Sequence, residues 1–269
     1  MSQLAPIQIS VINASTVVTD DDVRPVVDAL QTQVTNDFLP AWGVGAQLTF
    51  VPTGSAPAVG SWWLSILDDS DQAGALGYHD ITPDGLPLGK VFAGTDLKYG
   101  TQWSVTASHE LLEMLGDPNI NLTVFVQNDQ STGILYAYEV CDACEGDQFA
   151  YKVGNVLVSD FVFPSWFESF RPMGSAQFDQ TKQIQSPLQL LTGGYVGVFD
   201  VNSGSGWQQQ TLEKKPTETF SRGDVGSRRE RRRTPRQQWV VSHTHKEIAQ
   251  RAEIYRRRVQ HLRARQIAA

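Results

Sequence analysis

The stretch SHELLEMLGDP, residues 108–118, carries the most specific pattern in this sequence. His109 and Glu113 stand four residues apart, so on a helix their side chains lie one above the other on the same face. An imidazole nitrogen and a carboxylate oxygen at that spacing can bind one Zn²⁺ ion. Glu110 lies about 100° further around the helix. From there it can reach a metal-bound water and take its proton without itself binding the metal.

We expect this helix to run from about residue 102 to residue 115. Gly116 would end it, and Pro118 is a second stop signal. Two interpretations of its polar residues stay open, a metal site or the solvent-facing side of an ordinary amphipathic helix. The rest of the helix is apolar, and the first 212 residues hold only two histidines, His79 and His109. Both facts favour the metal site.

The segments around this helix predict a mixture of strands and helices. Residues 7–12 alternate and are rich in β-branched side chains, which is typical of a strand. Asp20 is expected to cap a helix that ends at Pro40. Further strands are expected at 47–51, 62–67, 76–80 and 90–93 before the motif helix, and at 134–141 and 152–158 after it. This order of elements predicts an α+β fold with a mixed sheet.

The motif and the elements before it resemble the zincin metallopeptidases, which carry His-Glu-x-x-His on a helix preceded by a mixed sheet. The resemblance implies that His109 is the first zinc ligand and Glu110 the general base. Glu113 stands where that family has its second histidine. A carboxylate there still suits Zn²⁺, but it lowers the net charge of the metal centre and also suits a harder ion such as Ca²⁺ or Mn²⁺.

The third ligand has two candidates. Glu139 resembles the downstream glutamate of the gluzincin branch, and on a strand over 134–141 it would share a face with Cys141. Glu139 has an equally good alternative as a strand-end carboxylate paired with backbone N–H groups. In the metzincin branch the third ligand position falls on Asn119, which is a poor zinc ligand, so the nearby Asp117 is the second candidate.

Cys141 and Cys144 form a Cys-x-x-Cys pair, but the sequence lacks the second pair that a structural zinc knuckle needs. Neighbouring carboxylates would raise the pKa of both thiols, which argues against a redox role, so we expect a buried or disulfide-linked pair. The acidic loop 142–147 could bind Ca²⁺ or simply be solvated. His79 could polarise a substrate carbonyl, but we expect it at the surface.

Charge is divided unevenly along the 269-residue chain. Of its 22 basic and 29 acidic residues, 16 and 6 lie from Glu213 onward, which leaves 6 and 23 in the first 212 residues. The two parts therefore carry net charges of +10 and −17, which sum to the −7 of the whole chain. Nucleic-acid binding by the acidic part is unfavourable, because phosphates need cations opposite them.

This division predicts three regions. We expect a zincin-like metal-binding domain over 1–205, a flexible basic linker over 206–242 and a basic amphipathic helix over 243–269. The basic tail could bind an anionic partner or the acidic domain of its own chain. Hydrophobic residues make up 41% of the sequence, which is enough for a core and excludes wholesale disorder.

No apolar run in the sequence approaches the roughly 18 residues of a membrane span. The first residues also lack the pattern of a secretory signal. We therefore expect a cytoplasmic or virion-associated protein. The segments EVCD at 139–142 and GGY at 193–195, together with the motif, are similar to proteins of tailed phages and bacteria, which implies a phage-related setting.

These features predict a metal-dependent hydrolase, in the first place a zinc peptidase that acts on a peptide or protein substrate. A metal ion held by His109, Glu113 and a third carboxylate would activate a water molecule, and Glu110 would accept its proton. The alternative is a non-catalytic binding or structural protein that keeps the metal for stability. An accessible water position would favour the enzyme, and full protein coordination would favour the alternative.

Overall fold

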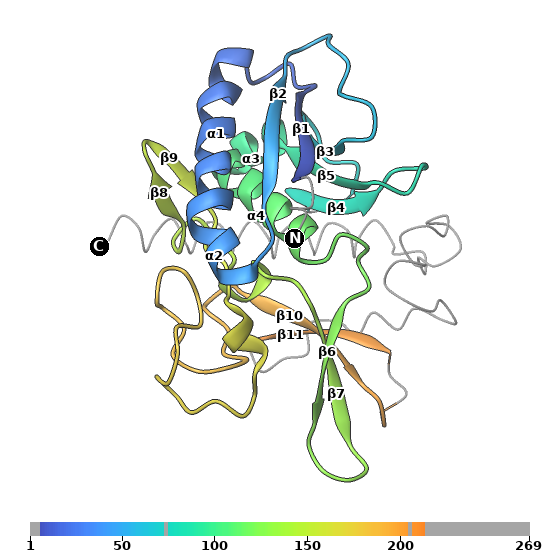
Figure 1. Cartoon of the computed structure of the whole chain (residues 1–269), viewed down its shortest axis with the longest axis vertical. Helices are drawn as coiled ribbons and strands as arrows, with labels where there is room; N and C mark the ends of the chain where they lie inside the picture. The colour runs from blue at the N-terminus through green and yellow to red at the C-terminus, as the bar shows by residue number, and fades with distance from the viewer. Residues whose placement is uncertain (1–5, 73–74, 204–205, 213–269) are drawn as a thin grey trace, which may run out of the picture.

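The computed structural model describes residues 6–72, 75–203 and 206–212 (Figure 1). The predicted helix over 243–269 lies outside these ranges, as does the predicted linker apart from 206–212. Across the described residues no helix has both the length and the apolar character needed to cross a membrane. The fold is mixed α+β, as the sequence predicts, with two larger sheets and a small hairpin.

The first sheet contains five strands in the order β2-β1-β3-β5-β4. Its strands are β1 (Ile7–Asn13), β2 (Ala46–Val51), β3 (Trp62–Leu67), β4 (Gly77–Ile81) and β5 (Pro87–Phe92). The pairs of β1 with β2, β1 with β3, and β3 with β5 are parallel. β4 pairs antiparallel with β5 and forms one edge of the sheet. All five strands lie close to the predicted segments.

The first helix, α1 (Asp20–Gln33), begins differently from the prediction. Thr19 is the N-cap, and its side chain and that of Asp22 form a reciprocal capping box. The Asp20 carboxylate instead accepts hydrogen bonds from Asn13 and Thr53. Asp20 was therefore the wrong cap, because its side chain joins α1 to neighbouring strands instead of to its own helix.

The predicted end of this helix at Pro40 is also wrong. A π-helical turn, η1 (Val34–Phe38), follows α1 and leads directly into α2 (Leu39–Trp42). In this turn the Leu39 N–H bonds the Val34 carbonyl five residues back, so Pro40 stands in the first turn of α2, where a missing N–H is tolerated. Gly43, with φ at 70°, ends α2.

Two further helices follow the first sheet. α3 (Ala93–Tyr99) leads to α4 (Trp103–Gly116), which packs against β4 and β5. α4 carries the SHELLEMLGDP motif and lies within one residue of its predicted bounds. Its apolar residues enter the core, and Leu111, Leu112 and Met114 are fully buried.

The second sheet contains four antiparallel strands in the order β11-β10-β7-β6. Its strands are β6 (Thr123–Gln127), β7 (Gly133–Ala137), β10 (Tyr195–Asp200) and β11 (Trp207–Thr211). Figure 1 shows it at the opposite end of the molecule from β1 and β2. Between β7 and β10 the chain forms two 3-10 turns, η2 (Asp142–Cys144) and η3 (Pro164–Phe167), and a hairpin of β8 (Tyr151–Val153) and β9 (Val156–Val158).

Three predicted boundaries in this half differ from the structure. The strand expected over 134–141 ends at Ala137, and the one expected over 152–158 is the β8–β9 hairpin. The folded unit also continues past the predicted boundary at 205, because β11 pairs with β10 along its whole length. Strand β11 is rich in glutamine, so it lacks the apolar pattern by which strands are recognised.

Candidate metal centre

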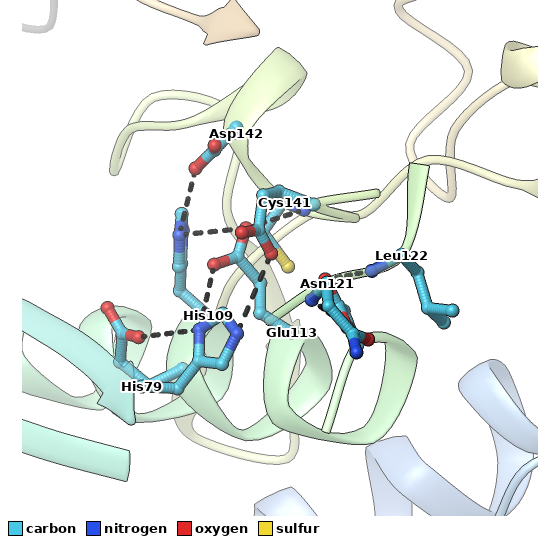
Figure 2. Close-up of polar contacts among 10 residues, drawn as sticks. His79, His109, Glu113, Asn121, Leu122, Cys141 and Asp142 are labelled. Atoms are coloured by element: carbon cyan, nitrogen blue, oxygen red, sulfur yellow. Dashed lines mark hydrogen bonds and ion pairs between the residues drawn. The ribbon is translucent and has the colours of Figure 1, made fainter. Parts of the chain in front are cut away.

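Two histidines and four carboxylates come together between the first sheet and the segment that follows β7 (Figure 2). We call them the His–carboxylate cluster: His79, His109, Glu110, Glu113, Glu139 and Asp142. α4 supplies three of them, β4 supplies one, and the chain after β7 supplies the last two. The side chain of His109 is 12% exposed and the others are less exposed still. The motif helix therefore does not turn its polar residues toward solvent.

Glu113 lies at the centre of the cluster. Its Oε1 atom lies 3.3 Å from Nε2 of His109, which is the pairing expected for residues four apart on a helix. Its Oε2 atom lies 3.6 Å from Nδ1 of His79. The backbone N–H of Cys141 also donates a hydrogen bond to Oε1, at 3.3 Å. One carboxylate thus faces both imidazole rings, each through a different oxygen.

The remaining carboxylates surround the two rings. Asp142 Oδ1 lies 3.4 Å from Nε2 of His109. Glu139 Oε2 lies 3.7 Å from Nε2 of His79, and Glu110 Oε2 lies 3.8 Å from Nδ1 of the same ring. These separations are longer than an ordinary hydrogen bond. Two ligand atoms bound about 2.1 Å from one tetrahedral Zn²⁺ lie about 3.4 Å apart, so the spacing suits a metal ion.

Two groups within this region have the composition of a metal site. His79, Glu113 and Glu139 form one, and His109, Glu113 and Cys141 form the other. In each group the candidate ligand atoms all lie within 4.8 Å of one another, and every residue is buried. Imidazole, carboxylate and thiolate are all zinc ligands, so a divalent ion fits either group, but these residues alone do not decide which ion.

The electrostatics of the cluster reflect an excess of negative charge. Burial disfavours the imidazolium of His109, but the Glu113 and Asp142 carboxylates outweigh it and raise the pKa of His109 well above its usual value. Burial raises the pKa of Glu113, but the His109 charge opposes it and leaves the pKa below the usual value. Burial and then Glu113 raise the pKa of Asp142. A bound cation would take the place of protons held here.

A second set of hydrogen bonds holds the helix that carries the motif. The Ser108 hydroxyl donates to Oε1 of Gln33, at 2.6 Å, and accepts from the backbone N–H of Ser159, at 3.0 Å. Gln33 in turn donates to the Ser159 carbonyl, at 2.9 Å. Both Gln33 and Ser108 are fully buried. This network joins α4 to the end of α1 and to the residue that follows β9.

A glycine on β4 makes room for Glu110. A Cβ atom on Gly77 would lie 2.7 Å from Oε1 of Glu110 and 2.8 Å from the Lys90 carbonyl, so a side chain there would push Glu110 away. A Cβ atom on Gly89, the residue paired with His79, would only touch Glu110, at 3.6 Å, and would clash with Leu64, at 2.7 Å. Glu110 therefore packs directly against the edge of the sheet beside His79.

Of the two predicted third ligands, the structure places one in the cluster and the other outside both candidate metal groups. Glu139 joins the cluster, although it lies beyond the end of β7 and not on a strand. The Asp117 carboxylate accepts hydrogen bonds from the backbone N–H groups of Asn121 and Leu122, at 3.0 and 3.1 Å, and belongs to neither candidate metal group (Figure 2). Asp117 thus orders the chain that leaves α4, with one carboxylate oxygen for each of the two N–H groups.

Two residues of the cluster, His79 and Asp142, were not expected from the sequence to be buried in the site. His79 was expected at the surface, but it is only 1% exposed. Asp142, expected in a loop that is solvated or binds Ca²⁺, is buried beside His109. The available signal for His79 was its rarity, since it is the second of two histidines in the first 212 residues. Its burial depends on the packing of β4 against α4, which local sequence does not encode.

The two cysteines are free and buried, which matches the buried alternative and not the disulfide. Burial raises the pKa of each thiol well above its usual value. Their roles differ, because Cys141 belongs to a candidate metal group and Cys144 does not. The Cys144 thiol instead donates a weak hydrogen bond to the Cys141 carbonyl, at 3.6 Å.

Comparison with family models, with curated proteins and with solved structures finds no match to this chain. The resemblance to zincin metallopeptidases therefore has no support from these comparisons.

Proposed function

We propose that this protein is a metal-dependent hydrolase whose metal site is the His–carboxylate cluster, and that its substrates are peptides. The observation that carries the proposal is the position of Glu113, whose two oxygens face His79 and His109 at separations that each suit coordination of a metal ion. Glu110 sits on the same helix, one residue from His109, as a base acting beside the metal must. A divalent ion bound there would supply Lewis acidity and lower the pKa of a coordinated water.

Different residues of the cluster would bind the metal and accept the proton. An ion would be held by Glu113 with one imidazole and a further donor, either His79 and Glu139 or His109 and Cys141, and Glu110 would accept the proton of the attacking water. Glu110 Oε2 lies 3.8 Å from Nδ1 of His79, so this base stands beside the group that contains His79. The low exposure of the cluster strengthens each of these interactions, because the dielectric constant is low where water is excluded.

Strand β4 favours a peptide as substrate. It is one of the two edge strands of the five-stranded sheet, and His79 stands in the middle of its five residues. The outer side of an edge strand presents backbone N–H and C=O groups that can pair with an extended chain. A peptide added to β4 in this way would pass beside the cluster. Pairing of this kind recognises the backbone of the substrate and not its side chains, so we expect peptides of many sequences to be accepted.

A second function is favoured by the burial of the site. The six cluster side chains provide enough donors to complete the coordination of an ion, and none is more than 12% exposed. A site closed in this way is typical of structural metals. The alternative is therefore a binding or structural protein in which the metal stabilises the fold.

One pair of variants separates the two functions. The full chain, loaded with Zn²⁺ or Mn²⁺, would be tested on casein and on a library of short peptides. Glu110→Gln should keep the metal and lose hydrolysis, because the amide cannot accept a proton. Glu168→Gln, which changes a carboxylate outside the cluster, is the control and should behave as wild type. Metal binding without hydrolysis of any substrate would favour the structural function, and absence of metal would contradict both.

A further inference from the structure

The two oxygens of Glu113 face two different donor sets. Oε1 faces Nε2 of His109, at 3.3 Å, on the side of Asp142 and Cys141. Oε2 faces Nδ1 of His79, at 3.6 Å, beside Glu110, and Glu139 faces the other nitrogen of that ring, Nε2, at 3.7 Å. Only Glu113 belongs to both candidate metal groups. A carboxylate with one oxygen toward each of two sites has the arrangement of a bridging ligand.

Each side has donors of its own besides Glu113. On one side Asp142 lies 3.4 Å from the His109 ring, and the Cys141 sulfur completes a group of three. On the other side Glu139 completes the group with His79. Each candidate site thus has an imidazole and at least one further anionic donor. Each site would therefore use only one of the two Glu113 oxygens.

Charge balance also favours two ions. The cluster holds four carboxylates, from Glu110, Glu113, Glu139 and Asp142, within contact distance of two imidazoles. Metal-bound imidazoles are neutral and a Cys141 ligand is a thiolate, so one divalent ion would leave three of five negative charges uncompensated in a buried site. Uncompensated buried charge is strongly unfavourable. Two divalent ions would leave only one.

We propose that the His–carboxylate cluster is a dinuclear centre in which Glu113 bridges two divalent ions. This inference rests on the proposed function, because it concerns the same cluster. One ion is held by His109, Asp142 and Cys141 and the other by His79 and Glu139, with Glu110 beside the second. Paired ions of this kind, about 3.5–4 Å apart, stabilise both the attacking and the leaving group in hydrolases.

The two sites differ in chemistry. A thiolate and an imidazole prefer a soft or borderline ion, so the site with Cys141 and His109 selects Zn²⁺ or Co²⁺. Carboxylates around a single imidazole also accept a harder ion such as Mn²⁺, so the site with His79 and Glu139 is the less selective one. The centre should therefore fill in two steps, the thiolate site first.

Metal stoichiometry tests the proposal. The full chain, stripped of metal, would be titrated with Zn²⁺ by calorimetry, and its content after dialysis measured by elemental analysis. Wild type should bind two ions, and His79→Gln and His109→Gln should each retain one. Glu168→Gln is the control and should retain two. Circular dichroism would show whether the variants are folded. If they are not, the number of ions bound by wild type still tests the proposal.

The possible results are distinct. A wild type that binds one ion, lost in His109→Gln and kept in His79→Gln, would overturn the dinuclear centre and leave the proposed function standing. A wild type that binds no ion would overturn both. Two ions in wild type and one in each histidine variant would support the bridge through Glu113.

Cobalt distinguishes the two sites spectroscopically. The first equivalent of Co²⁺ should give a near-ultraviolet band from thiolate-to-metal charge transfer, and the second should not increase it. Cys141→Ser should abolish the band. Cys144→Ser is the matched control, since Cys144 is also buried but lies outside both metal groups, and it should keep the band. A band that survives Cys141→Ser or never forms would overturn the assignment of that thiolate as a ligand.

Discussion

At the scale of single residues, Glu113 gives the cluster its geometry. A histidine at this position would offer one nitrogen to one ion, whereas the carboxylate presents an oxygen to each imidazole. The departure from His-Glu-x-x-His is therefore a feature with a physical use. A small residue matters as much, because Gly77 leaves the space in which Glu110 lies.

Gly77→Ala should displace Glu110. The added Cβ would lie 2.7 Å from Oε1 of Glu110 and 2.8 Å from a backbone oxygen that cannot move easily. We expect a loss of about 1–3 kcal/mol in unfolding free energy and a marked fall in any hydrolysis, measured by denaturant unfolding and substrate assay. Gly45→Ala is the control, since its Cβ would meet only the Leu39 side chain, at 3.3 Å. Equal behaviour of the two variants would contradict this role for Gly77.

Asp96, outside the cluster, predicts a pH dependence of stability. Burial raises the pKa of this carboxyl to about 7, although hydrogen bonds from Thr101 and Thr106 oppose the shift. The folded state therefore binds a proton that the unfolded state releases near pH 4. The stabilisation is present in full below pH 4 and is lost as the pH rises to 7, by on the order of 4 kcal/mol.

Asp96→Asn should remove this dependence, because an amide does not titrate. Urea unfolding of the variant and of wild type would be compared from pH 4 to pH 8. The unfolding free energy of the variant should rise relative to that of wild type as the pH rises from 4 to 7. A destabilisation by the amide that is the same at every pH would not change this dependence. The exposed Asp84→Asn is the control. Parallel curves for wild type and Asp96→Asn would show that Asp96 ionises normally.

At the scale of elements, the accuracy of the predictions followed the strength of local signals. α4 lies within one residue of its predicted bounds, because an apolar helix followed by a glycine and a proline leaves few alternatives. The strand over 134–141 was extended too far, since alternation continues in sequence after the chain turns at Ala137. His79 was placed at the surface, because its burial comes from α4, which follows β4 by more than twenty residues.

Ser108→Ala should loosen the attachment of α4 to α1. The substitution would leave the buried Gln33 side-chain oxygen and the Ser159 N–H without this hydroxyl. We expect a loss of about 2 kcal/mol in unfolding free energy, the cost of unsatisfied buried polar groups. Ser104→Ala on the same helix removes a single hydrogen bond, to the Leu157 carbonyl, and should cost less. A smaller effect at Ser108 than at Ser104, in denaturant unfolding, would refute the proposed role of this network.

At the scale of the whole molecule, the His–carboxylate cluster joins the two halves of the described chain. α4 and β4 belong to the first half, whereas Glu139, Cys141 and Asp142 lie on the segment that leaves the second sheet. The sequence predicted the motif on α4 and the general fold class, since both depend on local patterns. It offered Glu139 as a distant partner but did not place His79 or Asp142 in the site, because their burial depends on how separate elements pack against the helix.

The corrected boundary gives a prediction at this scale. A chain that ends at 212 keeps β11 and its pairing with Tyr195–Asp200, whereas a chain that ends at 205 removes it. The longer chain should therefore unfold at a higher temperature, with the metal content of the full protein. Thermal unfolding of both chains would be followed by circular dichroism. If the chain that ends at 205 is equally stable, β11 contributes nothing and the boundary predicted from the sequence is adequate.

The most direct test of the central claim is the metal content of the full chain and of its Glu113→Gln variant. Both would be purified without chelator, equilibrated with Zn²⁺, dialysed and measured by elemental analysis. Glutamine keeps the shape of the side chain and removes the negative charge that both candidate metal groups share. We predict stoichiometric zinc in wild type and its loss in Glu113→Gln. Wild type without zinc, or a variant that retains the wild-type content, would contradict the claim that this cluster is a metal centre.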